Sequence, residues 1–407
     1  MAEPIRVVHF ADVHVGMENY GRLDPLTGTS SRVRDFLDRL DEVIDHAIDR
    51  QADLAIFAGD AFRSRDPEPT QQREFAARIK RLADAMPTLL LVGNHDMPGM
   101  AAKASSIDIF QALEVPGVIV GHRAEGRVVE TGRGPVFLAW VPYPMRNRLL
   151  TREDLQGKSL SELEEALRRA VADVVAGLTE QAREQPMPRL LAGHLSLAEA
   201  RLGSERTILL GRDLSLPTST FSESAWDYVA LGHIHRHQDL HPNEHPPVIY
   251  SGSLERIDFG EEDETKGFCW VELGRGQTRW DFVPVAARPF RTIRVDARSE
   301  ADPTEAILRA TGGDDLQGAV VRILVQVRSD QEPLLREREV EAALEAASTV
   351  NVVREVESDS RIRLGDIAAE ALTPQQLVER YFETQGVAGE RLAGLLEKAG
   401  EILGEGA

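Results

Sequence analysis

The chain has 407 residues, enough for two or three domains, and its 42% hydrophobic and 28% charged residues are typical of a globular protein with a sizeable core. The formal net charge of −20 argues against nucleic-acid binding by simple electrostatic attraction, although metal ions or a basic partner can offset that charge locally. The single cysteine, Cys269, excludes disulfides and thiolate metal sites within the chain, and no apolar stretch suggests a membrane span, so we expect a cytoplasmic protein.

Residues 1–284 alternate short apolar strands with amphipathic helices. The strand IRVVHF, residues 5–10, is followed by a helix over 32–49 that has its apolar side chains on one face. Strands alternating with helices are typical of layered α/β folds with crossover connections, so we expect one α/β domain here. Further strands are expected at 53–60, 88–96, 189–194, 227–233 and 247–253, and further helices at 70–85, 101–113 and 159–184.

The sequence changes character near residues 284–289. The segment 285–370 reads as a small α+β domain, and it holds no cluster of residue types that would suggest catalysis. Its strands are expected at 290–297, 319–327 and 351–357, and its helices at 303–311 and 334–347.

Residues 371–407 are predicted to form a helix pair. Thr373 can cap the first helix, Pro374 suits its first position, Gln376 completes a capping box, and Gly386 can end the helix. An apolar stripe on the second helix fits two interpretations equally well. The hairpin either packs on its own domain or binds a partner.

Five short motifs each follow an apolar strand, where a sheet gives way to a loop. Open α/β sheets bind ligands at the carboxyl ends of their strands, so these loops are expected to converge. Alternate residues of an extended segment point to the same side, and the neighbouring glycines permit close approach of the backbone. The motifs are FADVH with Asp12 and His14, FAGD with Asp60, VGNHD with Asn94, His95 and Asp96, LAGH with His194, and LGHIH with His233 and His235.

The candidate ligands are aspartate, asparagine and histidine without sulfur. Mixed oxygen and imidazole donors suit manganese, iron or zinc better than a pure magnesium cage. Seven of them suit two ions that share a bridging carboxylate. Each motif alone fits turn chemistry or a hydrogen-bonded structural histidine, and the signal comes from their combination. His237 follows His233 and His235 at the same two-residue spacing, so it is a third candidate metal ligand in this segment.

The order DxH, GD, GNHD, GH, GHxH resembles that of the calcineurin-like metallophosphoesterases. More narrowly, the chain is similar to the SbcD-type nucleases, the bacterial counterparts of the archaeal and eukaryotic meiotic recombination eleven nuclease. The segments HFADVHVG and YSGSLERIDFGEEDETKGF and the C-terminal helix pair carry this narrower resemblance. It spans essentially the full length and is weakest in the second domain. The resemblance implies a layered β-sandwich core flanked by helices.

The resemblance also implies roles for the motif residues. One ion would be held by Asp12, His14, Asp60 and His235, and the other by Asp60, Asn94, His194 and His233. His95 would lie beside the scissile phosphate as a catalytic residue that stabilises the transition state or protonates the leaving oxygen. Asp96 would either orient His95 or cap the following turn. No ligand position is left for His237.

The implied activity is that of a two-metal DNA nuclease, with manganese as the expected metal. Two cations roughly 3.5–4 Å apart activate a water and stabilise the oxygens of an in-line displacement. The family implies 3′–5′ exonuclease and single-strand endonuclease activities in DNA double-strand-break repair, in the cytoplasm at the nucleoid. It implies a homodimer through the helices at 70–85 and 101–113, an SbcC-type coiled-coil ATPase docked on residues 371–407, and a capping domain at 285–370 that governs access of DNA.

Arg63 stands where some relatives carry a histidine implicated in activity, so that role does not transfer. Arg63, Arg65 and Arg236 are candidate DNA contacts, and a solvated surface arginine is the competing interpretation. Further basic residues that follow the motifs are Arg146, Arg148, Arg206, Arg212 and Arg256.

Two other functions compete with a nuclease. One is a metallophosphoesterase acting on a small phosphodiester or a phosphoprotein, which would cleave a model phosphodiester but leave labelled DNA intact. The other is a DNA-binding scaffold without turnover. The full set of candidate ligands together with His95 argues against the scaffold, because a degenerate site should have lost some of them.

Overall fold

The computed structural model describes residues 3–26, 28–97, 103–145, 149, 159–203, 214–313, 315–357, 373–384, 387 and 389–403. By its contacts the chain divides into two compact units. The first comprises residues 1–291 with 318–320, and the second 292–317 with 321–407. None of the helices in the described ranges is long and apolar enough to cross a membrane.

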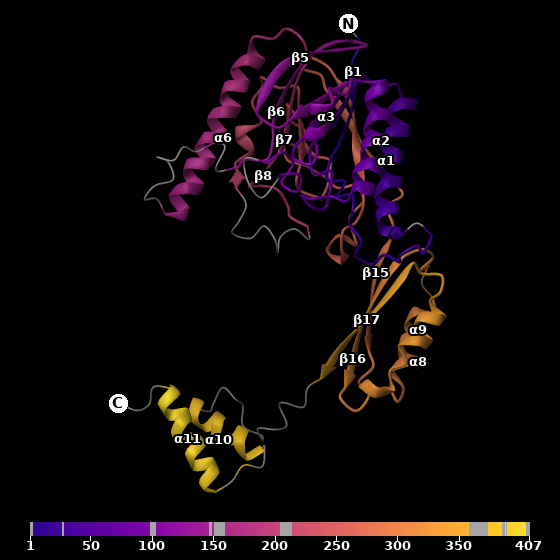
Figure 1. Ribbon diagram of the computed structural model, residues 1–407, viewed down its shortest axis with the longest axis vertical. Helices are drawn as coiled ribbons and strands as arrows, with labels where there is room; N and C mark the ends of the chain where they lie inside the picture. Colours follow the sequence, from indigo (N-terminus) through magenta and orange to yellow (C-terminus); the bar gives the residue numbers. More distant parts are fainter. Residues whose placement is uncertain are drawn as a thin grey trace. The chain divides into compact units, whose positions relative to one another are not determined.

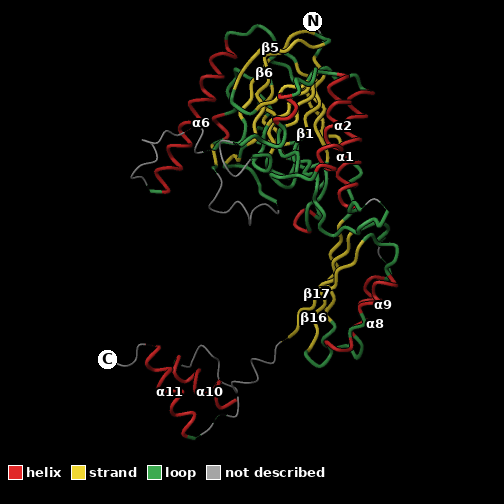
Figure 2. The backbone as a smooth tube through the Cα atoms, viewed as in Figure 1, coloured by secondary structure: helices red, strands yellow, loops and turns green. Residues whose placement is uncertain are grey.

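The first unit contains two six-stranded sheets, flanked by helices (Figures 1 and 2). The first sheet has the order β14-β13-β1-β2-β3-β4. Strands β1 to β4 run parallel, and β13 and β14 add an antiparallel edge. The bounds are β1 Ile5–Phe10, β2 Leu54–Phe57, β3 Thr88–Leu91, β4 Val118–Gly121, β13 Gly267–Leu273 and β14 Arg279–Pro284.

The second sheet has the order β11-β12-β10-β7-β6-β5. Its four central strands are parallel, and β5 and β11 are antiparallel edges. The bounds are β5 Glu125–Thr131, β6 Gly134–Val141, β7 Arg189–His194, β10 Tyr228–Gly232, β11 Gln238–Asp239 and β12 Val248–Tyr250, and a separate short pair is formed by β8 Ser196–Leu197 and β9 Ser215–Leu216.

Side-chain alternation along the strands explains the layers. In β1, Ile5 and Val7 enter the core between the two sheets, whereas Val8 and Phe10 face the core beneath the helices. A third core lies on the other face of the second sheet. Because both faces of each sheet are covered, the central strands read as almost unbroken apolar runs. The layered α/β sandwich predicted from sequence is confirmed.

Two helices of the first unit start at serine caps. Ser30 caps α1 (Ser31–Asp49), and Ser159 forms a capping box with Glu162 at the start of α6 (Leu160–Arg183). Helices α1 and α2 (Pro69–Ala85) pack beside each other, α3 is Asp108–Ala112, and the short 3₁₀ helices are η1 Thr218–Thr220 and η2 Phe259–Glu261. The helix expected over 101–113 is therefore shorter: residues 103–107 form bends and turns, and 101–102 lie outside the described residues.

The second unit contains a three-stranded sheet, β15-β16-β17, with short helices and a C-terminal helix pair. Asp302 accepts hydrogen bonds from the first turn of α8, which begins at Pro303 as predicted. Thr373 and Gln376 form the predicted reciprocal capping box, at 2.9 and 3.3 Å. The bounds are β15 Phe290–Asp296, α8 Pro303–Thr311, β16 Val320–Arg328, η3 Glu332–Leu334, α9 Glu337–Ala343, β17 Thr349–Glu357, α10 Pro374–Thr384 and α11 Glu390–Leu403.

Candidate metal centre

The motif residues gather at the carboxyl ends of the parallel strands of both sheets. Asp12 follows β1, Asp60 follows β2 and Asn94 follows β3, and these are neighbouring strands of the first sheet. His194 ends β7 and His233 directly follows β10, its neighbour in the second sheet. Parallel order within each sheet brings strand ends to one edge, and stacking the sheets joins the two edges.

The backbone at these strand ends is strained. Asp12, His14, Asp60 and His233 have φ angles of 53°, 47°, 61° and 97°, in the left-handed region that side chains other than glycine rarely adopt. Such conformations cost about 1–3 kcal/mol each and persist where the surrounding structure enforces them. Here the turns redirect each side chain from the sheet into a common space.

Two glycines are required by close contacts within this space. A Cβ atom on Gly59 would lie 2.3 Å from Nδ1 of His194, and one on Gly93 would lie 2.1 Å from Oδ1 of Asp60. Gly59 also has a φ of +103°. The prediction that glycines beside the motifs allow close approach is confirmed at both positions.

The first cluster joins the DVH motif to His235. Nε2 of His14 lies 3.1 Å from Nε2 of His235 and 3.7 Å from Oδ2 of Asp60. Asp12, His14 and His235 each offer one ligand atom, and these atoms lie within 4.8 Å of one another. This is the spacing expected of groups that surround one cation.

The second cluster is built around the side-chain oxygen of Asn94. This oxygen lies 3.0 Å from Nε2 of His194 and 2.9 Å from Nδ1 of His233. Nε2 of His194 is also 3.5 Å from Oδ1 of Asp60. Because Nδ1 of His194 donates to the carbonyl of Ala58 at 2.7 Å, Nε2 faces two acceptor oxygens, and a proton or a metal ion must lie between them.

Asp60 lies between the clusters and turns one oxygen to each. The histidines around Asp60 favour the ionised form of its carboxyl group. Burial by itself raises the pKa of Asp60, but the adjacent His194 and His95 hold that pKa well below its ordinary value. Burial likewise opposes charge on His194, yet the Asp60 carboxylate raises the pKa of His194 to about 9. The same field that retains a proton on His194 favours a cation there, so metal binding would release a proton.

His95 lies beside the first cluster but is held differently. Its backbone N–H donates to Oδ1 of Asp60 at 2.8 Å, and its Nδ1 lies 2.7 Å from the carbonyl oxygen of Arg63. Its ring stands edge-on to that of His14, with 4.9 Å between centroids. Donation from Nδ1 leaves Nε2 available for a substrate oxygen. His95 can also complete a ligand-atom group with His14 and Asp60.

Asp96 is buried and serves the backbone around Asp60. Its carboxylate accepts the N–H groups of Asp60, Ala61 and Gly93 at 2.9–3.0 Å, rather than a hydrogen bond from the His95 ring. Burial, with the neighbouring charge of Asp60, raises the pKa of Asp96 to about 6. Asp96 thus fixes the turns that present Asp60 and Asn94, and Arg63 orients His95.

His237 lies apart from both clusters. Its Nδ1 is 2.8 Å from the carbonyl oxygen of Tyr250, and its ring stacks on Phe282 with centroids 4.0 Å apart. The expectation that His237 is structural agrees with these contacts. His9 is also buried, and it links the two sheets through Tyr228 and the carbonyl of Leu231, at 3.1 and 3.2 Å.

A cavity of about 750 Å³ adjoins the centre. The exposed residues Arg63 and Arg65 line it together with Asn94 and His95, and Glu18, Asp66 and Glu68 line it as well, so its two arginines are balanced by acidic side chains. Arg236 is exposed, whereas Arg256 is half-buried and donates to the carbonyls of Glu264 and Arg288. Arg146, Arg148, Arg206 and Arg212 lie outside the described residues.

Glu261 is a residue of the centre that the strand-end motifs do not indicate. Its Oε1 lies 3.0 Å from Nδ1 of His235, and its Oε2 forms an ion pair with Lys266 at 2.8 Å. Both side chains are buried. In the sequence they sit in the run DFGEEDETKG, which reads as an exposed acidic loop. The one lysine in this acidic run, Lys266, is the sequence feature that could have indicated a buried ion pair.

A sandwich of two mixed sheets with aspartate, asparagine and histidine at its strand ends defines the class of metal-dependent phosphoesterases. The model of the calcineurin-like phosphoesterase family matches residues 5–237, more than half of the chain. The chain belongs to this family. The donor set of the two clusters fits divalent cations, the cofactors expected from sequence.

Curated relatives resemble the chain over much of its length. The SbcD component of the nuclease SbcCD of Escherichia coli is 27% identical over 282 residues, which cover 67% of this chain and 66% of that protein, slightly less than two thirds. The "DNA double-strand break repair protein Mre11" of Haloferax volcanii is 23% identical over 405 residues, covering 95% and 76%. A solved dimetal phosphatase from Danio rerio overlaps 68% of this chain and 98% of its own, at 11% identity and a TM-score of 0.40.

Proposed function

We propose that the chain is a two-metal-dependent DNA nuclease that hydrolyses phosphodiester bonds during repair of double-strand breaks. One ion would bind Asp12, His14, Asp60 and His235, and the other Asp60, Asn94, His194 and His233. The observation that carries this proposal is the placement of Asp60. Its two oxygens face different clusters, Oδ2 at 3.7 Å from His14 and Oδ1 at 3.5 Å from His194, as a bridging carboxylate requires.

The chemistry of the residues agrees with phosphodiester hydrolysis. Two bound cations, most favourably manganese, would supply charge neutralisation and an activated water. His95 presents Nε2 next to the candidate ligands because Nδ1 is bound to the Arg63 carbonyl. A proton on that nitrogen is in position to pass to the leaving oxygen, a contribution of typically about 10²–10⁴-fold. Arg63 and Arg65 would hold neighbouring phosphates.

The polymeric substrate and the partners are inferred from the relatives. Nucleases and break-repair proteins of 23–29% identity favour DNA over a small phosphodiester. We expect 3′–5′ exonuclease and single-strand endonuclease activities, a homodimer through α2 and α3, and a location in the cytoplasm at the nucleoid. An SbcC-type ATPase would bind the helix pair in residues 371–407, and residues 285–370 would govern access of DNA.

End-labelled single- and double-stranded DNA, incubated with the protein in manganese, magnesium or chelator, tests the function. The wild type should produce a manganese-dependent ladder that Asp60→Ala abolishes, because both ions lose a ligand. His95→Ala should retain two ions per chain and lose activity by about 10²–10⁴-fold. Cleavage of bis(p-nitrophenyl) phosphate without any DNA ladder would instead identify a small-phosphodiester hydrolase. DNA binding without cleavage of either substrate would indicate a scaffold.

A further inference from the structure

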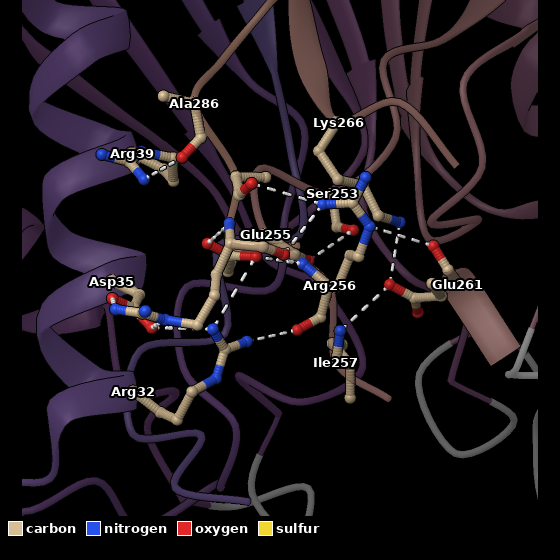
Figure 3. A network of polar contacts seen from close by, with 12 residues as sticks. Arg32, Asp35, Arg39, Ser253, Glu255, Arg256, Ile257, Glu261, Lys266 and Ala286 are labelled. Atoms are coloured by element: carbon tan, nitrogen blue, oxygen red, sulfur yellow. Dashed lines mark hydrogen bonds and ion pairs between the residues drawn. The ribbon is translucent and has the colours of Figure 1, made fainter. Parts of the chain in front are cut away.

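A buried carboxylate holds the ring of one candidate ligand. Glu261 has no exposed surface, and each of its oxygens has a separate partner. Oε1 lies 3.0 Å from Nδ1 of His235. Oε2 lies 2.8 Å from Nζ of Lys266 and accepts the N–H of Ile257 at 3.0 Å (Figure 3). If either oxygen moved away from its partner, a buried donor would be left without an acceptor.

This carboxylate is charged because a buried lysine balances it. Nζ of Lys266 lies 2.8 Å from Oε2 of Glu261 and both side chains are buried, so the two groups form an ion pair away from solvent. Lys266 in turn pairs with both Glu261 and Glu264, each at 2.8 Å. Lys266 therefore ties the carboxylate that contacts His235 to a second acidic side chain.

An ionised carboxylate can only accept, so its contact with His235 fixes the tautomer. Nδ1 of His235 carries the proton, and Nε2 keeps its lone pair, directed at the Nε2 of His14 3.1 Å away. Nδ1 of His14 has no hydrogen-bond partner among the described residues. Of the two facing imidazoles, His235 is therefore the one whose Nδ1 is held by a partner.

The turn that carries Glu261 is itself tied into a wider polar network. Arg256 donates to the carbonyls of Glu261 and Glu264 at 3.2 and 2.6 Å, and to the carbonyl of Arg288 at 2.9 Å. The backbone of His235 is held as well, because its carbonyl accepts from Nζ of Lys266 at 3.2 Å. Figure 3 shows Arg256 between the turn of Glu261 and the Glu255–Arg32 contacts. The ring of His235 is thus held by Glu261, and its backbone is held by Lys266, the partner of Glu261.

We propose that Glu261, held in place by Lys266, is a positioning residue that sets the affinity of the divalent cation bound by His14 and His235. This inference rests on the proposed two-metal function and extends it to a residue outside the ligand set. Partners of metal-binding histidines at this position typically contribute about 10–100-fold to metal affinity. Glu261 would act through the ring of His235 rather than as a ligand of its own.

The test compares Glu261→Gln with Glu264→Gln in the full chain. Glutamine has one acceptor oxygen, so it cannot accept from His235 and from Lys266 together. Glu264 shares Lys266 but does not contact His235, which makes Glu264→Gln the matched control. Manganese binding is measured by titration calorimetry, and the paramagnetic resonance spectrum reports whether two ions are coupled. Thermal unfolding in chelator checks the fold.

We expect wild type and Glu264→Gln to bind two ions with a coupled spectrum. Glu261→Gln should bind one ion normally and the other about 10–100-fold more weakly, with the coupling lost at low manganese. If Glu261→Gln does not fold, Glu261→Met with Lys266→Met removes both buried charges and the acceptor of His235, and the same weakening of one ion is expected. Unchanged affinities in whichever of these variants folds, or equal weakening in Glu264→Gln, would overturn the inference.

The wild-type measurements separate this inference from the proposed function. Two coupled ions without cleavage of DNA would refute the nuclease and leave the role of Glu261 to be judged by its own variants. A wild type that binds no divalent cation would overturn both.

Discussion

At the scale of single residues, buried histidines behave in opposite ways according to their partners. Burial lowers the pKa of His9 to about 3, since its contacts, the Tyr228 hydroxyl and the Leu231 carbonyl, do not compensate for lost solvation. His194 is equally buried, but the Asp60 carboxylate raises its pKa to about 9. Burial alone therefore does not indicate which histidine is a candidate ligand. The charge of its neighbours does.

His9 should make the first unit sensitive to acid. In the unfolded chain it takes up a proton near its ordinary pKa of 6.5, and in the folded chain only near 3. The unfolded state therefore binds more protons as pH falls below 6.5, and this residue removes about 1.4 kcal/mol of stability per pH unit until about pH 3.

Urea unfolding of metal-free wild type and His9→Gln at pH 7.0 and 5.0 measures this effect. The variant should be less stable at pH 7.0, because it alters the contact with Tyr228. Its loss of stability between the two pH values should be smaller than that of the wild type by about 2 kcal/mol. Equal losses in the two proteins would show that His9 is protonated in the fold.

At the scale of elements, the turns that follow the strands hold the candidate ligands, and Gly59 in one of these turns is constrained in two ways. Alanine there combines a φ of +103° with a Cβ atom 2.3 Å from the His194 ring. Gly134 has a φ of +122° but nothing within 4 Å of the added atom. A comparison of alanine substitutions at Gly59 and Gly134 therefore separates the cost of backbone strain from the cost of steric contact with the candidate ligands.

We expect Gly134→Ala to cost about 1–2 kcal/mol of the free energy of unfolding, the usual penalty for a left-handed residue. Gly59→Ala should cost at least about 2 kcal/mol more and should also reduce bound manganese, since His194 must move. Urea unfolding in chelator and metal analysis check both effects. Equal costs with full metal content in the two variants would contradict the crowded geometry at Gly59.

The elements also show what sequence can predict. Helix α8 is predictable with its bounds because Asp302 and Pro303 are local signals, and the candidate ligands are predictable because each follows a strand. Strand β5 is not, since its residues are mostly exposed and lack regular alternation. Glu261 escapes prediction for another reason. Its burial and its contact with His235 arise from tertiary packing, which no local pattern in an acidic loop reports.

At the scale of the whole molecule, the single thiol lies at the centre of the first unit. Cys269 is in β13, paired with His9 of β1 on one side and Phe282 of β14 on the other. It has no exposed surface. Burial, only partly offset by a hydrogen bond with Tyr228, raises the pKa of Cys269 to about 12. The thiol is therefore both inaccessible and protonated at neutral pH.

Cys269 should not react with Ellman's reagent in the native protein. With a pKa of about 12, roughly one thiol in ten thousand is ionised at pH 8, against about a quarter for an ordinary cysteine. We expect no colour in buffer at pH 8 and one equivalent per chain in urea. Reaction in buffer at the rate of free cysteine would show that β13 opens readily.

The low reactivity of the Cys269 thiol has a practical consequence for spectroscopy. Cysteines introduced at exposed positions such as Val128 in the first unit and Leu334 in the second would be the sole points of attachment for maleimide dyes, with no need to remove the native residue. Energy transfer between donor and acceptor on such a doubly labelled chain would then report the distance between its two units as manganese, DNA or a partner protein is added.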